Sequence, residues 1–468
     1  MKVIHLSQSD STGGAARAAY RIHQALRSSG VDSTMWVEQK HSGEWTVLGA
    51  ASRIEKLLRL FQFITAEFSR ALLKTSNTVL HSPSNLPSRW VKRINLSDAD
   101  VIHLHWVQGE MLSISDIRRI KKPIVWTLHD MWGFCGAEHY AEDSRWRKGY
   151  TRSNRPNQES GFDLNKWTWN RKRKHWTNPI HIVTPSHWLT NCVGESALMS
   201  DWPTTTIPYP LDMDVWQPMS QVGARGLLRL PLEVPLVLFG AIGGSEDPRK
   251  GFDLLEHALL ILRDSPEALA LGFELAVFGE RAPENLPVLG FPIHYLGHLH
   301  DDLSLSALYN AADVLVLPSR QDNLPLVGQE SLSCGTPIVA FDTGGLSDLV
   351  PHKRNGYLAK PFDAADLANG ITWVLNQSTS KKNRMRNASR NQAVKTFAPA
   401  TVANQYESVY RKALNHHAAA SRMLGVFTTL HQKSSKRRRR IHGASTETHD
   451  PAAPTTILSN PPNTERKL

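Results

Sequence analysis

Residues 321–349 read QDNLPLVGQESLSCGTPIVAFDTGGLSDL and decide the fold class. The preceding apolar run is typical of a buried strand, and Asp322 or Asn323 is suited to cap a helix that Gly335 ends before a second strand. Open α/β sheets bind ligands at the carboxyl ends of their strands, and helix amino ends favour phosphate. Glu330, near the middle of this helix, could accept hydrogen bonds from two adjacent ribose hydroxyls.

Strands alternate with helical patterns on both sides of this stretch. Short apolar runs typical of buried parallel strands occur at 3–6, 101–105, 124–128 and 180–184, and again at 236–239, 274–278, 293–296, 314–317 and 337–341. The sequence therefore predicts an α/β protein with two parallel-sheet domains. We expect a first domain at 1–205, a proline-containing linker at 206–234, a second domain at 235–398, a closing helix at 399–418 and a disordered basic tail at 419–468.

The composition is that of an ordinary globular protein. The chain has 468 residues, 41% of them hydrophobic and 21% charged, and at about 150 residues per domain this length predicts two or three domains. These values exclude a largely disordered, collagen-like or disulfide-rich chain. Cys135, Cys192 and Cys334 form no CxxC pair, which argues against a cysteine zinc site and favours a reducing, cytoplasmic location. No apolar run reaches the roughly 18 residues of a membrane-spanning helix.

The net charge of +11 is concentrated in two segments. An insertion at 144–176 contains ten basic and two acidic side chains, and residues 433–468 contain eight basic and three acidic ones. Phosphates or an anionic membrane surface are candidate partners for both segments, and solvated surface charge is the alternative. No nucleic-acid recognition module accompanies these charges, so we expect no nucleic-acid partner.

The insertion at 144–176 interleaves its cations with four tryptophans. Aromatic faces suit sugars and cations suit phosphates, so we predict that residues 171–174 contact a lipid-diphosphate acceptor or the inner face of the cell membrane. Residues 53–74 show the pattern of a basic amphipathic helix, which could lie on a membrane or pack on its own domain.

Two glycine-containing stretches are candidates for phosphate contact. Residues 243–253, GGSEDPRKGFD, place Arg249 and Lys250 at the start of a helix, where fixed cations could stabilise a departing diphosphate. Residues 11–17, STGGAAR, follow the first strand, and Gly13 and Gly14 would let backbone amides approach a phosphate. The chain has no GxGxxG motif in this position, which counts against a nicotinamide cofactor.

Histidines follow two strands of the first domain. His129, in TLHDMWGF, would lie at the carboxyl end of a strand, where it could hydrogen-bond a substrate hydroxyl or a leaving oxygen. His103 and His105 occupy a neighbouring strand end. Their spacing could suit a metal, but no suitably spaced carboxylate accompanies them, so we interpret both as structural and expect no metal site.

The two carboxylates eight residues apart, followed by CGTPIVA and TGG, resemble the signature of family 4 of the glycosyltransferases. The resemblance covers roughly residues 1–415, and the DNLP variant is similar to the branch that builds bacterial exopolysaccharide and lipopolysaccharide, the colanic-acid type. It implies the GT-B fold, in which two Rossmann-like domains face a cleft and a carboxyl-terminal helix returns to the first domain. It also implies a retaining, metal-independent enzyme with a nucleotide-sugar donor and no cofactor.

The resemblance assigns the donor site. By position, Glu330 holds the donor ribose, Asp322 contacts the donor sugar, and Leu326 of the same helix belongs to the donor-binding set. Gly13 and Gly14 meet the donor phosphates from the first domain.

The resemblance also implies a catalytic set of His129, Asp322 and Lys250. His129 matches the histidine of the family's His-Asp-x-Trp pattern, and Lys250 matches the lysine of its Arg-x5-Lys phosphate clamp. The position of the clamp arginine is Gly244 in this chain, so Arg249 or the backbone amides of the 243–244 turn would have to compensate.

We therefore expect a glycosyltransferase of cell-surface polysaccharide synthesis, with a glycan or lipid-linked acceptor bound to the first domain. Two alternatives remain. A nucleotide-sugar epimerase shares the two-domain architecture but needs no acceptor. A catalytically degenerate, sugar-binding homologue would account for the glycine at position 244.

Overall fold

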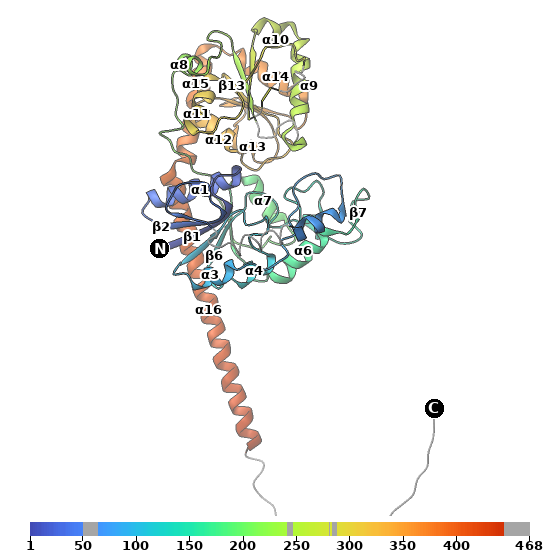
Figure 1. Cartoon of the computed structure of the whole chain (residues 1–468), viewed down its shortest axis with the longest axis vertical. Helices are drawn as coiled ribbons and strands as arrows, with labels where there is room; N and C mark the ends of the chain where they lie inside the picture. Colours follow the sequence, from blue (N-terminus) through green and yellow to red (C-terminus); the bar gives the residue numbers. More distant parts are fainter. Residues whose placement is uncertain (50–63, 241–246, 280, 283–287, 444–468) are drawn as a thin grey trace, which may run out of the picture. The chain divides into compact units, whose positions relative to one another are not determined.

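The computed structural model describes residues 1–49, 64–240, 247–279, 281–282 and 288–443 (Figure 1). The chain divides into two compact units, Met1–Leu414 and Asn415–Leu468. The first unit contains two parallel sheets, one from each half of the sequence. The expected α/β architecture with two parallel-sheet domains is therefore confirmed.

The first sheet has seven strands in the order β3-β2-β1-β5-β6-β8-β9, all paired in parallel. Its strands are β1 (Lys2–Ser9), β2 (Asp32–Gln39), β3 (Val47–Leu48), β5 (Val101–Leu104), β6 (Ile124–Thr127), β8 (His181–Thr184) and β9 (Thr204–Thr206). The helices of this half are α1 (Gly14–Ser28), α3 (Trp90–Leu96), α4 (Ile114–Arg119), α5 (Arg145–Lys148), α6 (Leu164–His175) and α7 (His187–Glu195). A separate antiparallel pair joins β4 (Leu73–Lys74) to β7 (Ser160–Gly161) of the insertion.

The second sheet has six parallel strands in the order β12-β11-β10-β13-β14-β15. Its strands are β10 (Leu236–Gly240), β11 (Glu274–Phe278), β12 (Ile293–Tyr295), β13 (Val314–Leu317), β14 (Ile338–Phe341) and β15 (Gly356–Ala359). The remaining helices are α8 (Gln221–Leu228), the 3-10 turn η1 (Pro248–Lys250), α9 (Phe252–Arg263), α10 (Pro266–Leu271), α11 (Asp302–Ala311), α12 (Leu326–Ser333), α13 (Leu346–Leu349), α14 (Ala364–Leu375), α15 (Thr379–Phe397) and α16 (Pro399–Gly443).

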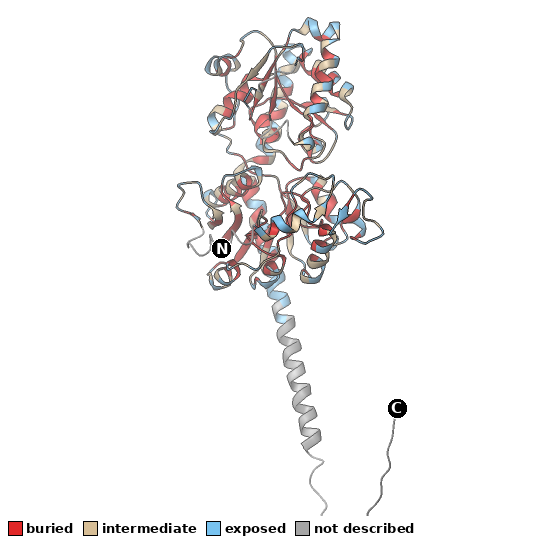
Figure 2. Cartoon of the chain, turned by 45° about the vertical axis from the view of Figure 1, so that its right-hand side comes forward, coloured by how far each residue is buried: buried red, intermediate tan, exposed pale blue. Residues whose placement is uncertain are grey.

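Alternate residues of β1 face opposite sides of the first sheet, as the pleat requires. Ile4 and Leu6 pack into one apolar core, whereas Val3 packs on the opposite side with residues of α1 and α16. His5 and Ser7 have the same parity as Val3 and are fully buried. The central strands of both sheets are largely buried, whereas the edge strands β9 and β12 are only partly buried (Figure 2). One face of the first sheet therefore contains a buried polar layer.

Helix α16 begins against the first sheet, which confirms the expected return of the closing helix. The Tyr406 hydroxyl lies 3.1 Å from Thr127 Oγ1, and the Tyr410 hydroxyl lies 2.7 Å from His103 Nδ1. The helix continues to Gly443, beyond the end predicted at residue 418, and the disorder of residues 419–468 stays a prediction. The remainder of that tail, residues 444–468, lies outside the described residues.

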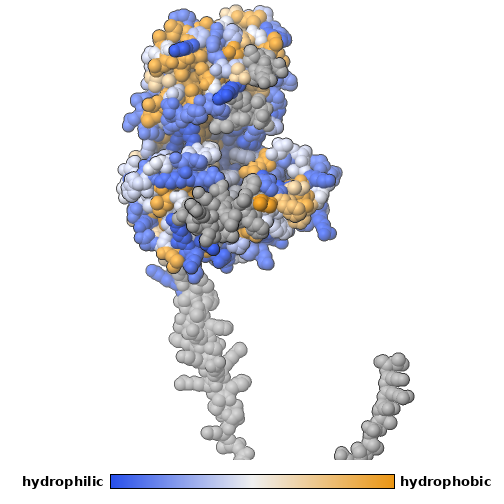
Figure 3. Space-filling model, viewed as in Figure 1, coloured by the Kyte–Doolittle hydropathy of each residue, from blue (hydrophilic) through white to orange (hydrophobic). Residues whose placement is uncertain are grey.

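Among the described residues, no helix combines the length and the apolar character needed to cross a membrane. The surface seen in Figure 3 mixes hydrophilic and apolar side chains. Residues 64–71 are helical, and Ile64 and Phe68 on this helix are exposed. The rest of the amphipathic segment predicted from residue 53 lies outside the described residues.

Candidate functional site

The loop between β13 and α12 forms the centre of the site. Helix α12 begins at Leu326, with Pro325 at its N-cap position and no side-chain cap. Asp322 instead accepts a hydrogen bond from the neighbouring Asn323 amide at 3.0 Å. The predicted capping by Asp322 or Asn323 is therefore wrong, because both residues belong to the loop that precedes the cap. Leu326 is partly buried against an apolar cluster formed by residues of both domains.

Asp322 forms an ion pair with Lys250. The sequence had predicted that both side chains would face one cleft. Lys250 Nζ lies 2.7 Å from Asp322 Oδ2. Burial raises the pKa of Asp322, but the adjacent Lys250 and Arg249 cations lower it by more, so the net pKa is lowered. The carboxyl therefore stays ionised at pH values below its ordinary pKa. The two predicted residues thus form one charged, largely buried pair.

A tight approach of two loops brings these groups together. Lys250 ends the single turn η1, and Gly251 follows it with φ of 69°. A Cβ on Gly251 would lie 2.0 Å from the carbonyl oxygen of Pro318, so this position requires glycine.

Arg249 lies beside the same pair and contacts the first domain. Its guanidinium carbon is 4.5 Å from the centroid of the Tyr140 ring, and its Nη1 donates to the Gln321 carbonyl at 3.2 Å. The 243–244 turn, which the sequence offered as the other substitute for the clamp arginine, lies outside the described residues.

Glu330 lies at the middle of α12 and is 1% exposed. Its Oε1 accepts a hydrogen bond from Arg21 Nη2 at 2.8 Å, and its Oε2 accepts one from the Tyr309 hydroxyl at 3.0 Å. The predicted ribose-binding carboxylate is therefore held in place by two residues that the sequence analysis did not single out.

Gly13 and Gly14 open helix α1, which supplies Arg21. Gly13 is the N-cap with φ of 84°, and a Cβ at either glycine would meet no atom within 4 Å. One turn before Arg21, Arg17 Nη2 lies 2.5 Å from Asp302 Oδ1. Helix α1 thus directs two cations toward carboxylates of the second domain.

His129 is placed at the site, but its imidazole is fully engaged within the protein. Its Nδ1 lies 2.8 Å from the Tyr209 hydroxyl and its Nε2 lies 3.2 Å from His105 Nδ1. Burial lowers the pKa of His129 to about 4, so the ring is neutral. The contact with the site runs through its main chain, because Asn323 Nδ2 donates to the His129 carbonyl at 3.1 Å.

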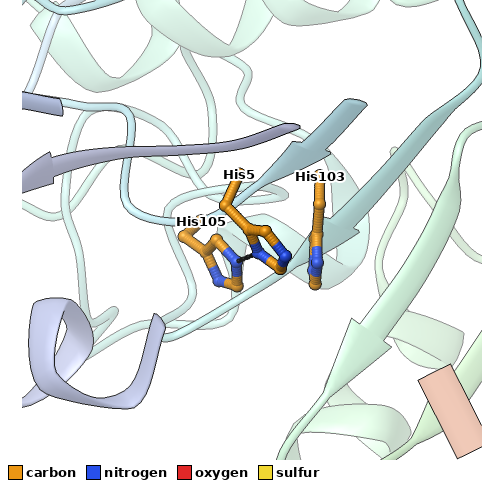
Figure 4. A group of neighbouring side chains, drawn as sticks. All are labelled: His5, His103 and His105. Atoms are coloured by element: carbon orange, nitrogen blue, oxygen red, sulfur yellow. Dashed lines mark hydrogen bonds between the residues drawn. The ribbon is translucent and has the colours of Figure 1, made fainter. Parts of the chain in front are cut away.

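His5, His103 and His105 form a cluster beneath this site (Figure 4). Parallel pairing of β1 with β5 sets His5 beside His103, and all three rings are buried. Their candidate ligand atoms lie within 4.8 Å of one another, which is close enough to share a metal ion. Five of the six ring nitrogens already have hydrogen-bond partners, and His5 Nε2 is the exception. The cluster therefore fits a hydrogen-bonded network better than a ligand set.

The insertion does not present its cations as predicted. Lys172 is fully buried, and its Nζ donates to the carbonyls of Trp132, Cys135 and Gly136. Arg171 donates to the main chain of residues 83–85. Within the 171–174 group, these two cations therefore support the fold, whereas the other two are exposed.

Of the residues that sequence reasoning missed, Arg21 left a detectable signal. It recurs four residues after Arg17 in an alanine-rich helix, so both lie on one face. Tyr209 and Tyr309 gave none, because each acts through partners far away in the sequence. Asn323 was predicted only as a helix cap, and its contact with the His129 carbonyl also depends on a distant residue.

Two family models match the chain, one in each domain. The model described as Glycosyltransferase Family 4 matches residues 12–215, and the model described as Glycosyl transferases group 1 matches residues 236–377.

Curated relatives match part of the chain. A D-inositol 3-phosphate glycosyltransferase of Geodermatophilus obscurus is 31% identical over 231 residues, which are 47% of this chain and 49% of that protein. A glycogen synthase of Mycobacterium tuberculosis is 36% identical over 119 residues, which are 25% of this chain and 28% of that protein. The chain thus spans about half the length of the first relative and less of the second.

Solved structures share the fold over most of the chain. Sucrose-phosphate synthase from Thermosynechococcus elongatus superposes with a TM-score of 0.62 at 18% identity, covering 89% of this chain and 100% of that one. Anabaena HepE in complex with UDP-glucose gives a TM-score of 0.59 at 17% identity, with coverages of 88% and 100%. WaaG, a glycosyltransferase involved in lipopolysaccharide biosynthesis, gives 0.55 at 14% identity, with coverages of 86% and 98%. With both domains matched by family models and this fold, the chain belongs to the family 4, group 1 glycosyltransferases of the GT-B type.

Proposed function

We propose that this glycosyltransferase moves a sugar from a nucleotide-diphosphate sugar to a glycan or lipid-linked acceptor in cell-surface polysaccharide synthesis, with retention and without a metal ion. One observation carries the proposal. Lys250 on Asp322 and Arg21 on Glu330 form two cation–carboxylate pairs, one in the loop before α12 and one at the middle of α12. The likeness to HepE, solved with UDP-glucose, and to WaaG of lipopolysaccharide biosynthesis supports this choice of donor and pathway class.

In this proposal Glu330 binds the ribose without losing its present partners. A carboxylate has two oxygens and about four lone-pair positions. Arg21 and Tyr309 use one position on each oxygen, so two ribose hydroxyls can donate to the others. Glu330 is only 1% exposed. Entry of the ribose therefore requires a small movement of α1 or of the loop between β13 and α12, which we call the donor loop.

The diphosphate would then lie against Lys250 and Arg249, with the sugar beside Asp322. As the bond between the anomeric carbon and the phosphate oxygen breaks, the diphosphate gains charge that these fixed cations stabilise. The acceptor oxygen bonds to the same face of the anomeric carbon, and its proton passes to the departing phosphate oxygen. Asp322, ionised and held by Lys250, positions the sugar.

The acceptor is proposed to bind the first domain near the insertion. Lys172 and Arg171 are committed to main-chain carbonyls, so lipid phosphate contact falls to the exposed Arg173 and Lys174. Phe162 and Trp167 are partly exposed nearby and contact each other at 5.9 Å. Cations beside exposed aromatic rings suit the surface of an anionic membrane, and peripheral membrane contact is part of this proposal.

The proposal is tested by screening nucleotide sugars with and without a lipid-linked or glycan acceptor. We expect acceptor-dependent release of nucleotide diphosphate, a product whose anomeric configuration by NMR matches that of the donor, and turnover that survives excess EDTA. A changed nucleotide sugar without acceptor would identify an epimerase. Loss of turnover with EDTA, restored by Mg²⁺ or Mn²⁺, would contradict the metal-free mechanism.

A further inference from the structure

A continuous chain of hydrogen bonds joins the buried histidines to Tyr209. His5 Nδ1 lies 2.9 Å from His105 Nε2, His105 Nδ1 lies 3.2 Å from His129 Nε2, and His129 Nδ1 lies 2.8 Å from the Tyr209 hydroxyl. All four residues are at least nine-tenths buried. At the inner end of the chain, His5 Nε2 has no partner.

Neutral imidazole carries one N–H and one lone pair, so these bonds must all point the same way. If His5 Nδ1 donates to His105, then His105 Nδ1 donates to His129, and His129 Nδ1 donates to the Tyr209 oxygen. In the opposite order, the Tyr209 hydroxyl donates to His129 and each histidine carries its proton on Nε2. A mixed order would place two protons or two lone pairs face to face.

The two orders differ in the group that they leave unpaired at the inner end. In the Nδ1–H order, His5 Nε2 is a bare lone pair. In the Nε2–H order, it is a buried N–H without an acceptor, which is the rarer and costlier defect. The first order also leaves the Tyr209 proton uncommitted, since among the described residues the hydrogen bond of its hydroxyl is the one to His129.

Tyr209 lies beside the donor loop. Its carbonyl accepts a hydrogen bond from Gln329 Nε2 of α12 at 3.2 Å, and the carbonyl of its partner His129 accepts from Asn323, the neighbour of Asp322. Both ends of the His129–Tyr209 pair are thus tied to the elements that carry Asp322 and Glu330. Burial raises the pKa of the Tyr209 hydroxyl, and neighbouring groups that include Asp322 raise it further. The protonated hydroxyl is therefore within electrostatic reach of the carboxylate that is proposed to position the donor sugar.

We propose that His5 and His105 are positioning residues that hold His129 in its Nδ1–H tautomer, and that His129 thereby makes the Tyr209 hydroxyl a hydrogen-bond donor to an oxygen of the bound donor sugar. This rests on the proposed function. Both ring nitrogens of His129 already have hydrogen-bond partners. In this proposal the ring therefore acts on the substrate through Tyr209 rather than by direct contact.

Matched amide variants separate this role from packing. Asparagine places its amide where Nδ1 was, and glutamine places it where Nε2 was. His105→Asn can still donate to His129, whereas His105→Gln reaches only His5. In the same way, His5→Asn can donate to His105 and His5→Gln cannot.

We expect each Gln variant to lower kcat/KM for the nucleotide sugar by about three- to tenfold relative to its Asn counterpart, the size of one neutral hydrogen bond. Tyr209→Phe should lose at least as much, and adding His105→Gln to it should cause no further loss. Nucleotide Kd should stay within about twofold throughout. If the smaller Asn variants are as impaired as the Gln variants, the histidines only fill space and the proposal is overturned.

The tautomers provide a readout that needs no activity. In the full chain labelled with ¹⁵N-histidine, NMR should show the proton on Nδ1 in His5, His105 and His129, each assigned by its single substitution. Nε2–H tautomers or imidazolium ions at neutral pH would overturn the relay. If no nucleotide sugar is turned over by the parent protein, the proposed function fails, while the tautomers still decide the order of the hydrogen bonds.

Discussion

The donor cleft and the insertion both contain cations with fixed partners, but these partners differ in kind. In the cleft, the partly buried Lys250 faces Asp322, and Arg21 faces Glu330 and Asp302. In the insertion, Lys172 donates to three main-chain carbonyls. A cation opposite a carboxylate forms a pair to which a substrate can add hydrogen bonds. A cation whose donors all end on carbonyls closes a turn and offers nothing further.

The partner of each basic residue, and not the number of basic residues nearby, therefore indicates whether it belongs to a ligand site. The insertion holds ten basic side chains, yet its buried Lys172 supports the fold. In the cleft, Lys250 and Arg21 are each next to a residue proposed to bind the donor. Local charge density therefore predicts ligand binding poorly unless the partners of each cation are known.

The largest expected effect is on folding, at Lys172. Lys172→Met should lower the free energy of unfolding by about 3 kcal/mol or more, because it leaves buried carbonyls of the 132–136 turn without a donor. Urea unfolding measures the change. The control is Lys174→Met, an exposed neighbour, which should change stability by no more than about 0.5 kcal/mol. Equal effects of the two substitutions would show that Lys172 is not structural.

In the cleft, the corresponding substitution should affect turnover instead. Lys250→Met removes a cation from the proposed diphosphate site, and losing one such preorganised charge costs about 100-fold in kcat. We expect the melting temperature to change much less than in Lys172→Met. Steady-state kinetics with the donor identified by screening measures the loss. An unfolded Lys250→Met protein, or one with parental kcat, would remove the contrast between the two regions.

The buried imidazoles extend the comparison to histidine. Burial lowers the pKa of His5, His103 and His105 well below the ordinary value and that of His129 to about 4. Between pH 6.5 and about 4, these histidines are protonated in the unfolded chain but not in the folded chain. The free energy of unfolding therefore falls as the pH falls. Each histidine contributes a slope of up to about 1.4 kcal/mol per pH unit.

His5→Asn removes one of these groups. The stability difference between parent and variant should therefore shrink as the pH of urea unfolding is lowered from 8 to 5. Parallel stability curves across this range would show that His5 is not held neutral by the fold.

The smallest effect is expected at the exposed cations of the insertion. Arg173→Gln with Lys174→Gln should weaken binding to anionic vesicles by about 1 kcal/mol per charge at low salt, and less at high salt, with nucleotide affinity unchanged. Co-sedimentation with vesicles containing anionic lipid measures it, and vesicles of zwitterionic lipid are the control. If the double variant binds vesicles as the parent does, Arg173 and Lys174 are solvated surface charges that do not contact a membrane.

Short-range patterns predicted the fold and the charged pair of the site. Alternating apolar runs predicted both parallel sheets, and the positions of Asp322 and Lys250 after two strands of the second domain predicted that both would face one cleft. These features depend on local periodicity and on the rule that parallel strands end at one side.

What the sequence could not predict depends on contacts between distant residues. The burial of Lys172 follows from a turn almost 40 residues earlier, and the saturation of His129 follows from Tyr209 in the segment between the domains. Asp322 lies before the helix rather than at its cap, and its carbonyl accepts a hydrogen bond from the Gly345 amide of the following loop at 2.9 Å. A charge or histidine pattern alone cannot show whether neighbouring elements have already used its hydrogen bonds.

The central claim is that Glu330 of α12 holds the ribose of a nucleotide-sugar donor. Calorimetric titration of UDP, GDP and ADP into the parent chain, Glu330→Gln and the exposed control Glu195→Gln tests it most directly. A charged hydrogen bond is worth about 1.5–3 kcal/mol, so the account predicts at least about tenfold weaker binding of the preferred nucleotide to a folded Glu330→Gln protein, and parental affinity for Glu195→Gln. Parental affinity of Glu330→Gln for that nucleotide would contradict the account.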